Sequence, residues 1–242
     1  MATDLATAAE MFRPQRLSSR ADRDPTGIPD PDPAALERGR RAKDLEAFHR
    51  EIGSRYADCR FETFSTREPG QANALADVRS TARRLGSHCD AGLLLVGPPG
   101  TGKDHLASAA AAFTIMELGK SVGWINGIEW YSRQRDRIAA DRSESEEIAR
   151  LITPDVLIVS DPLPPDASLT SYQAAMLYQV IDRRYRNMKA TWATINVVDQ
   201  KDLARRMTGP IADRILDNAT VVQCWWPSHR RAFRSPSKEA AS

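Results

Sequence analysis

The residues best suited to chemistry form a glycine-rich turn directly after an apolar run. The turn reads Gly97-Pro98-Pro99-Gly100-Thr101-Gly102-Lys103, and the run before it is Leu93–Val96. Glycines let backbone N–H groups curl around an anion, and the N-terminus of a following helix adds a favourable dipole. A lysine at the end of such a turn reaches the outer phosphates of a nucleotide. The turn therefore predicts a phosphate-binding loop (P-loop), with a purely structural glycine turn as the alternative.

Two polar positions depart from the usual pattern around such a loop. The residue after the lysine is normally Ser or Thr, whose hydroxyl binds Mg²⁺, but here it is Asp104. The apolar run Asp155–Asp161 ends in Ser160 and Asp161, where a metal-associated carboxylate and a water-polarising acid are expected. We interpret Ser160 as the metal-associated residue and Asp161 as the catalytic one. The alternative is a buried strand with a polar end.

These departures suggest that a hydroxyl and a carboxylate have exchanged places. In this hypothesis Asp104, Ser160 and Asp161 hold Mg²⁺, and nucleotide binding depends strongly on the metal because a carboxylate otherwise repels phosphates. The rival hypothesis is decay, with weak nucleotide binding and slow or absent hydrolysis. Asn196, after Thr191–Ile195, would position water near the γ-phosphate or simply cap a turn.

The elements that must position these residues alternate along the chain. Apolar runs predict strands at 92–96, 121–126, 155–161, 190–197 and 219–226. Helical spacing predicts helices at 75–85, 103–118, 128–140, 171–186 and 201–217, and another over about 34–56. Alternation of strands and helices indicates right-handed βαβ units. The expected fold class is α/β, a three-layer αβα core with a parallel sheet.

The composition limits the setting of the protein. The chain has 242 residues and a net charge of +2, which is too small to imply nucleic-acid binding by itself. Its three cysteines are far apart and form no disulfide framework, which favours a reducing compartment. No apolar run approaches the roughly 20 residues that span a bilayer, and the N-terminus lacks a signal-peptide core. We expect a cytoplasmic protein.

Several motifs, in the right order, resemble one family. The P-loop resembles the Walker A motif of AAA+ ATPases. The continuation Asp104-His105-Leu106-Ala107 is similar to that of bacterial replicative-helicase loaders (DnaC-type) and of transposition helper ATPases (IstB-type). The segments 185–196, 211–216 and 226–230 resemble their sensor 1 region, arginine-finger segment and closing motif. The resemblance covers about Phe61 to Arg230.

The resemblance implies a P-loop NTPase of the AAA+ type without a full helical lid, with ATP/ADP and Mg²⁺ as cofactors. It adds His105 and Arg230 to the nucleotide-binding residues, the latter as a sensor within its own subunit. It makes Asn196 a catalytic sensor residue. It also implies self-association through the ATPase core, with Arg214 reaching a neighbour's γ-phosphate, or else Arg183 or Arg184.

The composition along the chain and the resemblance together imply a domain plan. Residues 1–33 form a flexible, proline-broken N-terminal extension, 34–60 a helical partner-binding segment, 61–234 the ATPase core, and 235–242 a second disordered tail. Arg133, Arg135 and Arg137, beside Trp130 and Tyr131, form either a basic and aromatic track for single-stranded DNA or a solvated helix face.

Three functions remain open at this point. The first is an ATPase with an atypical metal site and weak, DNA-stimulated hydrolysis, which assists loading of a replicative DNA helicase onto single-stranded DNA. The second is a transposition helper ATPase that delivers a transposase to DNA. The third is a non-hydrolysing adaptor that uses nucleotide only to fix its shape.

Overall fold

The computed structural model describes residues 32–141, 143–165, 167–207 and 209–230, and the account below concerns these. The chain divides into two compact units, Met1–Leu36 and Glu37–Ser242. The N-terminal extension expected at 1–33 and the tail expected at 235–242 lie outside the described residues, apart from Asp32 and Pro33 at the start of the first helix.

A parallel sheet of five strands forms the centre of the second unit. The strands are β1 Gly92–Gly97, β2 Val122–Asn126, β3 Val156–Ser160, β4 Ala190–Asn196 and β5 Ala219–Gln223. Their order is β2-β3-β4-β1-β5, so β4 lies between the P-loop strand and the strand that ends at Ser160. In register, Gly97 pairs with Asn196, and Ser160 pairs with Thr194. The polar strand ends predicted from the sequence are therefore neighbours at one edge of the sheet.

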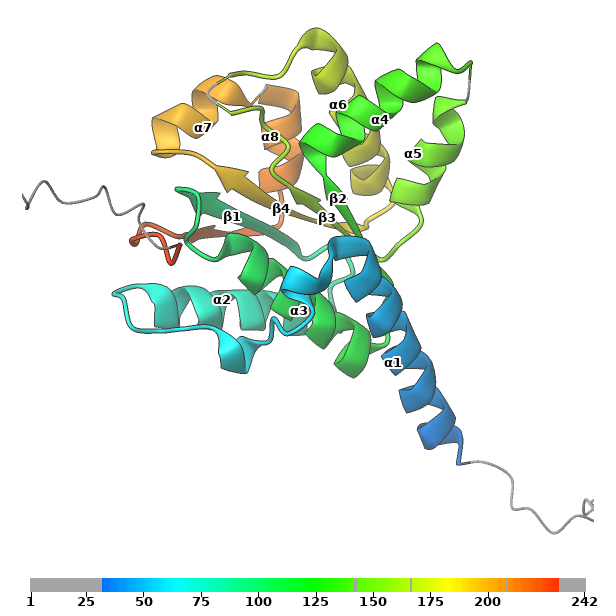
Figure 1. The fold of residues 1–242 in the computed structure, drawn as a ribbon, viewed down its shortest axis with the longest axis vertical. Coiled ribbons are helices and arrows are strands. Elements are labelled where there is room, and N and C mark those ends of the chain that lie inside the picture. Colours follow the sequence, from blue (N-terminus) through cyan, green and yellow to red (C-terminus); the bar gives the residue numbers. More distant parts are fainter. Residues whose placement is uncertain (1–31, 142, 166, 208, 231–242) are drawn as a thin grey trace, which may run out of the picture. The chain divides into compact units, whose positions relative to one another are not determined.

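Helices cover both faces of this sheet (Figure 1). They are α1 Pro33–Ile52, α2 Gln71–Arg84, α3 Lys103–Leu118, α4 Gly127–Ala139, α5 Glu144–Ile152, α6 Ser171–Arg186, α7 Gln200–Arg206 and α8 Gly209–Leu216. Short 3-10 turns occupy Ser54–Tyr56 and Phe61–Thr63. Figure 1 shows α2 and α3 against one face, and α4 to α8 on the other side. The three-layer α/β fold predicted from the sequence is confirmed.

Alternation along β1 explains why its sequence is apolar throughout. Leu93 and Leu95 belong to the hydrophobic cluster that contains α2 and α3, whereas Leu94 and Val96 belong to the cluster on the α6 and α8 side. Strands that are buried on both faces read as continuous apolar runs, as expected for parallel sheets between helical layers. None of the helices in the described ranges is both long and apolar enough to cross a membrane.

The helices differ from the prediction in two places. The single helix expected at 201–217 is two helices, α7 and α8, and Pro210 occupies the first turn of α8. Proline lacks a backbone N–H and fixes φ, so it is accepted at the start of a helix but not in its interior. The helix α5 was not predicted at all. Its N-cap is Ser143, whose side chain accepts a hydrogen bond from the Ser145 N–H at 3.2 Å.

Candidate nucleotide-binding site

The P-loop connects β1 to α3, and its glycines are required by conformation and by close contact. Gly97, Gly100 and Gly102 have φ angles of 151°, 83° and 91°, in the region that favours glycine. A Cβ atom at Gly100 would lie 2.0 Å from the Ser228 Oγ, and one at Gly97 would lie 2.5 Å from the Cys224 carbonyl oxygen. The loop therefore has no space for a side chain at Gly97 or Gly100. This geometry fits a phosphate group.

Lys103 starts α3 and is only 5% exposed. Its Nζ donates to the carbonyl oxygens of Gly97 at 2.9 Å and Pro98 at 2.7 Å, so the ammonium is held at the loop. Burial lowers the pKa of Lys103 from its usual value, and the nearby carboxylates, chiefly Asp161, oppose this shift. The first turn of α3 also leaves N–H groups without intrahelical partners, which favours an anion at this position.

A cleft of about 550 Å³ opens beside the P-loop. Among the predicted site residues, its lining contains Pro99, Gly100, Gly102, Lys103, Asp104, His105, Asp161, Asn196 and Arg230. Other residues that were not predicted for the site also line it: Arg55, Tyr56 and Cys59, which precede the core predicted at 61–234, and Thr63, Phe64 and Ser65, which lie at its start. No sequence motif marked this second group, because the position of these residues depends on how the segment after α1 packs against α3.

Asp104 lies among hydroxyl groups from neighbouring strands. Its Oδ1 accepts hydrogen bonds from the Thr194 Oγ1 at 2.7 Å and the Ser160 Oγ at 3.1 Å, and its Oδ2 accepts one from the Tyr56 hydroxyl at 3.4 Å. Asp104 and Ser160 are thus in direct contact, as the exchange hypothesis requires. Thr194 was missed, although its position two residues before Asn196 places it on the same side of β4.

Asp161 and Asn196 form a second pair, at the ends of β3 and β4. The Asn196 Nδ2 donates to the Asp161 Oδ1 at 2.6 Å. Burial and then the charge of Asp104 raise the pKa of Asp161 to about 6, against the opposing effects of Lys103 and the Asn196 hydrogen bond. A carboxyl group with such a pKa is suited to accept a proton from water near neutral pH.

The oxygen donors around Asp104 fit Mg²⁺. Within the described ranges, no group of three or more His, Cys, Asp or Glu residues is placed to hold a metal ion. Mg²⁺ is commonly bound through one or two carboxylates together with nucleotide phosphates, not by a complete protein cage. Asp104 and Asp161 line the cleft and supply two carboxylates for such a partial ligand set, whereas the hydroxyls of Ser160 and Thr194 are buried and donate to the Asp104 Oδ1.

The chain end of the described region closes over the P-loop. The His229 N–H donates to the Gly100 carbonyl oxygen at 2.9 Å, and Arg230 lines the cleft. His105 lies on α3 with its Nε2 3.1 Å from the Arg60 carbonyl oxygen, and burial lowers its pKa. Both predicted additions to the nucleotide-binding residues, His105 and Arg230, therefore face the same cleft as Lys103.

The family model that matches this chain is described as "IstB-like ATP binding protein", and it covers residues 64–237. The match spans more than half of the chain. The protein belongs to the IstB-like ATP-binding family.

Relatives of this IstB-like protein agree with the fold. The replicative helicase loader DnaC of Escherichia coli (strain K12) is 28% identical over 200 residues, which is 81% of this chain and 80% of the relative. A crystal structure of the DnaC helicase loader superposes with a TM-score of 0.64 at 22% identity, over 71% of this chain and 99% of that one. Domain III of the Thermotoga maritima replication initiation protein DnaA superposes with a TM-score of 0.59 at 17% identity. This superposition covers 71% of this chain and 68% of the DnaA domain. The fold is of the AAA+ type.

The arginines considered as fingers for a neighbouring subunit lie in different environments. Arg214 does not line the cleft. Its Nε donates to the Asp182 Oδ1 at 2.9 Å, and its guanidinium lies 4.8 Å from the centre of the Tyr178 ring. Arg184 is fully buried and donates to four carbonyl oxygens and one hydroxyl. Arg184 therefore cannot reach a neighbouring molecule, and the suggestion that it serves as a finger is wrong. Arg183 is exposed.

The predicted aromatic half of a DNA track is also wrong. Trp130 is fully buried and Tyr131 is 2% exposed, because both belong to the hydrophobic cluster against the sheet. They cannot stack on bases in this structure. Arg133 and Arg135 are exposed, and Arg137 donates to the Ser143 carbonyl oxygen at 2.7 Å. A solvated basic face describes these arginines.

Proposed function

We propose that this IstB-like protein is an ATP-binding AAA+ protein that assists loading of a replicative DNA helicase onto single-stranded DNA. The observation that carries the enzymatic part is the meeting of the P-loop lysine, Lys103, with the Asp161–Asn196 pair in one cleft. The helicase part is supported by the 28% identity to a replicative helicase loader over most of both chains. We place the protein in the cytoplasm, where such a helicase works.

In the proposed mechanism each residue of the cleft has one task. The P-loop N–H groups and Lys103 bind the β- and γ-phosphates, which places the γ-phosphate before Asp161. Asp104 and Ser160 are the residues that would hold Mg²⁺, which would supply positive charge to neutralise the phosphates. Asp161 accepts a proton from the attacking water, and Asn196 orients that carboxylate through its 2.6 Å hydrogen bond.

Contacts around Asp104 support an active metal site in preference to a decayed one. A decayed site would leave the carboxylate as an unneeded charge next to Asp161, where like charges are unfavourable. Instead three hydroxyl groups donate to it. In this proposal one carboxylate and one hydroxyl serve the metal, with the roles of positions 104 and 160 reversed, and the direct contact between Asp104 and Ser160 supports it.

Turnover of ATP tests the enzymatic part of this proposal. We expect the wild-type protein to hydrolyse ATP, faster with single-stranded DNA, and expect Lys103→Ala and Asp161→Asn to abolish turnover. Lys103→Ala should also lose nucleotide binding, whereas Asp161→Asn should keep it. Nucleotide binding without any turnover, with or without DNA, would favour the third function, a non-hydrolysing adaptor.

A transposition helper ATPase is the second candidate function, because the matching family model is named for IstB. The two candidates share the cleft and differ in the partner protein. Co-precipitation of the purified chain with a replicative helicase or with a transposase from the same organism separates them. Capture of the transposase alone would replace the helicase-loading proposal.

A further inference from the structure

Arg206, in the last turn of α7, is a buried charged residue outside the lining of the cleft. It is 7% exposed, and so is Asp202, whose Oδ2 lies 3.1 Å from the Arg206 Nη1. Burying a guanidinium is unfavourable unless its donors are satisfied. One carboxylate oxygen satisfies only a part of the five N–H donors. The other partners of Arg206 therefore indicate what the residue does.

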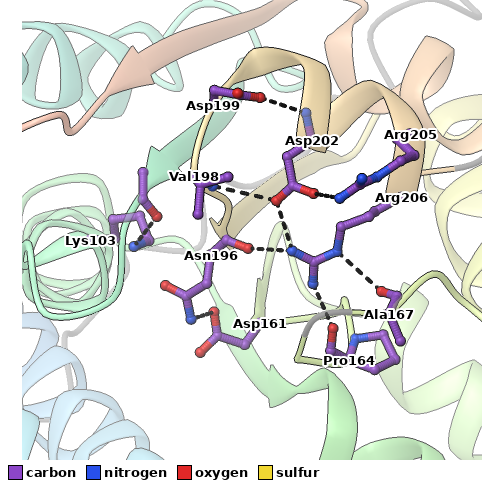
Figure 2. Close-up of polar contacts among 11 residues, drawn as sticks. Lys103, Asp161, Pro164, Ala167, Asn196, Val198, Asp199, Asp202, Arg205 and Arg206 are labelled. Carbon is purple, nitrogen blue, oxygen red and sulfur yellow. Dashed lines mark hydrogen bonds and ion pairs between the residues drawn. The ribbon is translucent and has the colours of Figure 1, made fainter.

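Those partners are backbone carbonyl oxygens from two different segments (Figure 2). The Arg206 Nη1 donates to the Asn196 carbonyl at 3.1 Å, at the end of β4. Its Nη2 donates to Pro164 at 2.5 Å, and its Nε donates to Ala167 at 3.1 Å, both in the connection that follows β3. The guanidinium of an arginine offers five N–H donors spread over three nitrogen atoms in one plane, whereas a lysine ammonium offers three donors from a single nitrogen and cannot reach the same set of oxygens.

The peptide group between Asn196 and Val197 is held at both of its polar atoms. Arg206 binds its carbonyl oxygen, and the Val197 N–H donates to the Gly97 carbonyl oxygen at 3.2 Å. The backbone of Asn196 is thus fixed between α7 and the first residue of the P-loop. From this position the Asn196 side chain donates to the Asp161 Oδ1. Figure 2 shows the Asn196 side chain turned toward Asp161 and its carbonyl turned toward Arg206.

The segment after Asp161 needs an outside support. Asp161 has a φ angle of 47°, in the left-handed region that few non-glycine residues adopt. It is followed by Pro162, and Pro164 and Pro165 come soon after. Prolines have no N–H, so this segment can make few backbone hydrogen bonds of its own. The guanidinium of Arg206 supplies the donors that the segment lacks.

We propose that Arg206, oriented by Asp202, is a positioning residue that holds Asp161 and Asn196 in the arrangement required for nucleotide hydrolysis. It joins the segment after β3 to the end of β4 and does not itself line the cleft. The proposal rests on the proposed function in one respect, because the reaction that it supports is the hydrolysis of ATP. The contacts themselves belong to the protein alone and are testable without turnover.

The test compares Arg206→Lys with Arg205→Ala as a matched control. Arg205 precedes it on α7, also contacts Asp202, and its side chain is 75% exposed. Three quantities are measured: kcat for ATP, the Kd of a fluorescent ATP analogue with Mg²⁺, and the ¹H–¹⁵N NMR signal of the Asn196 side-chain amide. The amide signal is assigned by its loss in Asn196→Ala.

Arg206→Lys is expected to lower kcat about tenfold or more, because small misplacements of catalytic groups cost one to two orders of magnitude. The Kd should change less than about twofold, and the Asn196 amide signal should shift toward that of a solvent-exposed amide. Arg205→Ala should leave all three quantities unchanged. Adding Arg206→Lys to Asn196→Ala should lower kcat no further, because both changes disrupt one unit.

The opposite results would overturn the proposal. One such result is an unchanged Asn196 amide signal in Arg206→Lys. Another is a Kd for the ATP analogue that rises by the same factor as kcat falls. A third is a fall in kcat and a shift of the amide signal in Arg205→Ala that equal those in Arg206→Lys. Asp202→Asn serves as a second variant if Arg206→Lys does not fold. If the wild-type protein shows no turnover, the hydrolytic part of the proposed function fails, whereas the amide signal still decides whether Arg206 positions Asn196.

Discussion

Asp104 stands where most P-loops carry a hydroxyl, and its surroundings explain how the carboxylate is accommodated. Ser160 and Thr194 lie side by side in register on adjacent strands, and both donate to the Asp104 Oδ1. The sequence could identify the departure at position 104 and pair it with position 160. It could not identify Thr194, since nothing in a strand residue's type reveals which neighbour it faces across a sheet.

The exchange of positions 104 and 160 predicts a specific pattern of ATP turnover. Asp104→Thr removes the carboxylate, and Ser160→Asp adds a second one beside it, so each single variant should lose at least about tenfold in kcat. The double variant restores one carboxylate and one hydroxyl and should regain most of the activity. A gain of activity in Asp104→Thr alone would contradict the exchange and favour decay.

A second residue-scale prediction concerns Asp161 and the stability of the fold. Burial, with the charge of Asp104, raises the pKa of Asp161 from 3.8 to about 6. Between these pH values the folded protein binds more protons at this site than the unfolded chain, so the free energy of unfolding falls as pH rises through that window. Asp161→Asn removes the buried charge and should stabilise the protein by about 1–3 kcal/mol at pH 8.

Urea unfolding in EDTA, without nucleotide, measures this difference at pH 8 and at pH 4. At pH 4 the wild-type carboxyl group is protonated in the folded state, so the two proteins should be nearly equal in stability. A residue that destabilises the fold at working pH is typical of a functional site. Equal stability of the two proteins at pH 8 would show that Asp161 is not held as a buried charge.

At the scale of elements, the sequence predicted the strands and the helix after the P-loop. It did not predict the helix α5 or the buried face of α4, and both of these helices precede β3 along the chain. Continuous apolar runs marked β1, β3 and β4 because each is buried on both faces. The helix α5 has the apolar residues Ile148 and Leu151 among charged ones, a pattern too short to distinguish from a loop. Trp130 and Tyr131 on α4 are buried, but the sequence did not show which face of that helix packs against the core.

Arg184 shows how one side chain can join several elements. It lies on α6 and donates to the carbonyl oxygens of Leu151 and Pro154 near the end of α5, of Asp155 before β3, and of Ala190 in β4. Burial lowers the pKa of Arg184 to about 10, so it remains a cation at neutral pH. A sequence pattern alone could not separate this structural arginine from its exposed neighbour Arg183.

Replacing Arg184 should therefore destabilise the fold strongly. Arg184→Ala leaves buried carbonyl oxygens without donors, and we expect a loss of about 3 kcal/mol or more in the free energy of unfolding. Arg183→Ala is the control, and its effect should stay within about 0.5 kcal/mol because the side chain is exposed. Urea unfolding followed by circular dichroism measures both. Similar small losses in the two variants would refute this assignment.

At the scale of the whole molecule, the cleft collects residues from both ends of the described chain. Tyr56 precedes the P-loop by many residues and donates to Asp104, whereas His229 follows it and binds the loop at Gly100. The family resemblance predicted a nucleotide-binding role for Arg230 in the closing motif, but not the hydrogen bond from His229 to the loop. The first contact depends on tertiary packing and had no local signal. Arg214 lies outside this cleft, so any catalytic role for it requires a second molecule.

Mixing of variants tests whether Arg214 acts across molecules. Lys103→Ala has no working P-loop but keeps Arg214, and Arg214→Ala has the reverse defect. We expect each variant to be nearly inactive alone. Their mixture should regain up to about a quarter of wild-type turnover per subunit, because at some interfaces the intact P-loop of one subunit meets the intact Arg214 of its neighbour. Arg186→Ala, which loses another contact to Asp182, is the control and should stay active. A mixture as inactive as its components would exclude this role.

The central claim is that ATP binding in this cleft drives the loading of a replicative helicase. The most direct measurement is the amount of replicative helicase from the same organism retained on circular single-stranded DNA, with wild-type protein or with Lys103→Ala, in the presence of ATP and Mg²⁺. The account predicts several-fold more retained helicase with wild-type protein than with Lys103→Ala or with no added protein. Equal retention in all three reactions would contradict it.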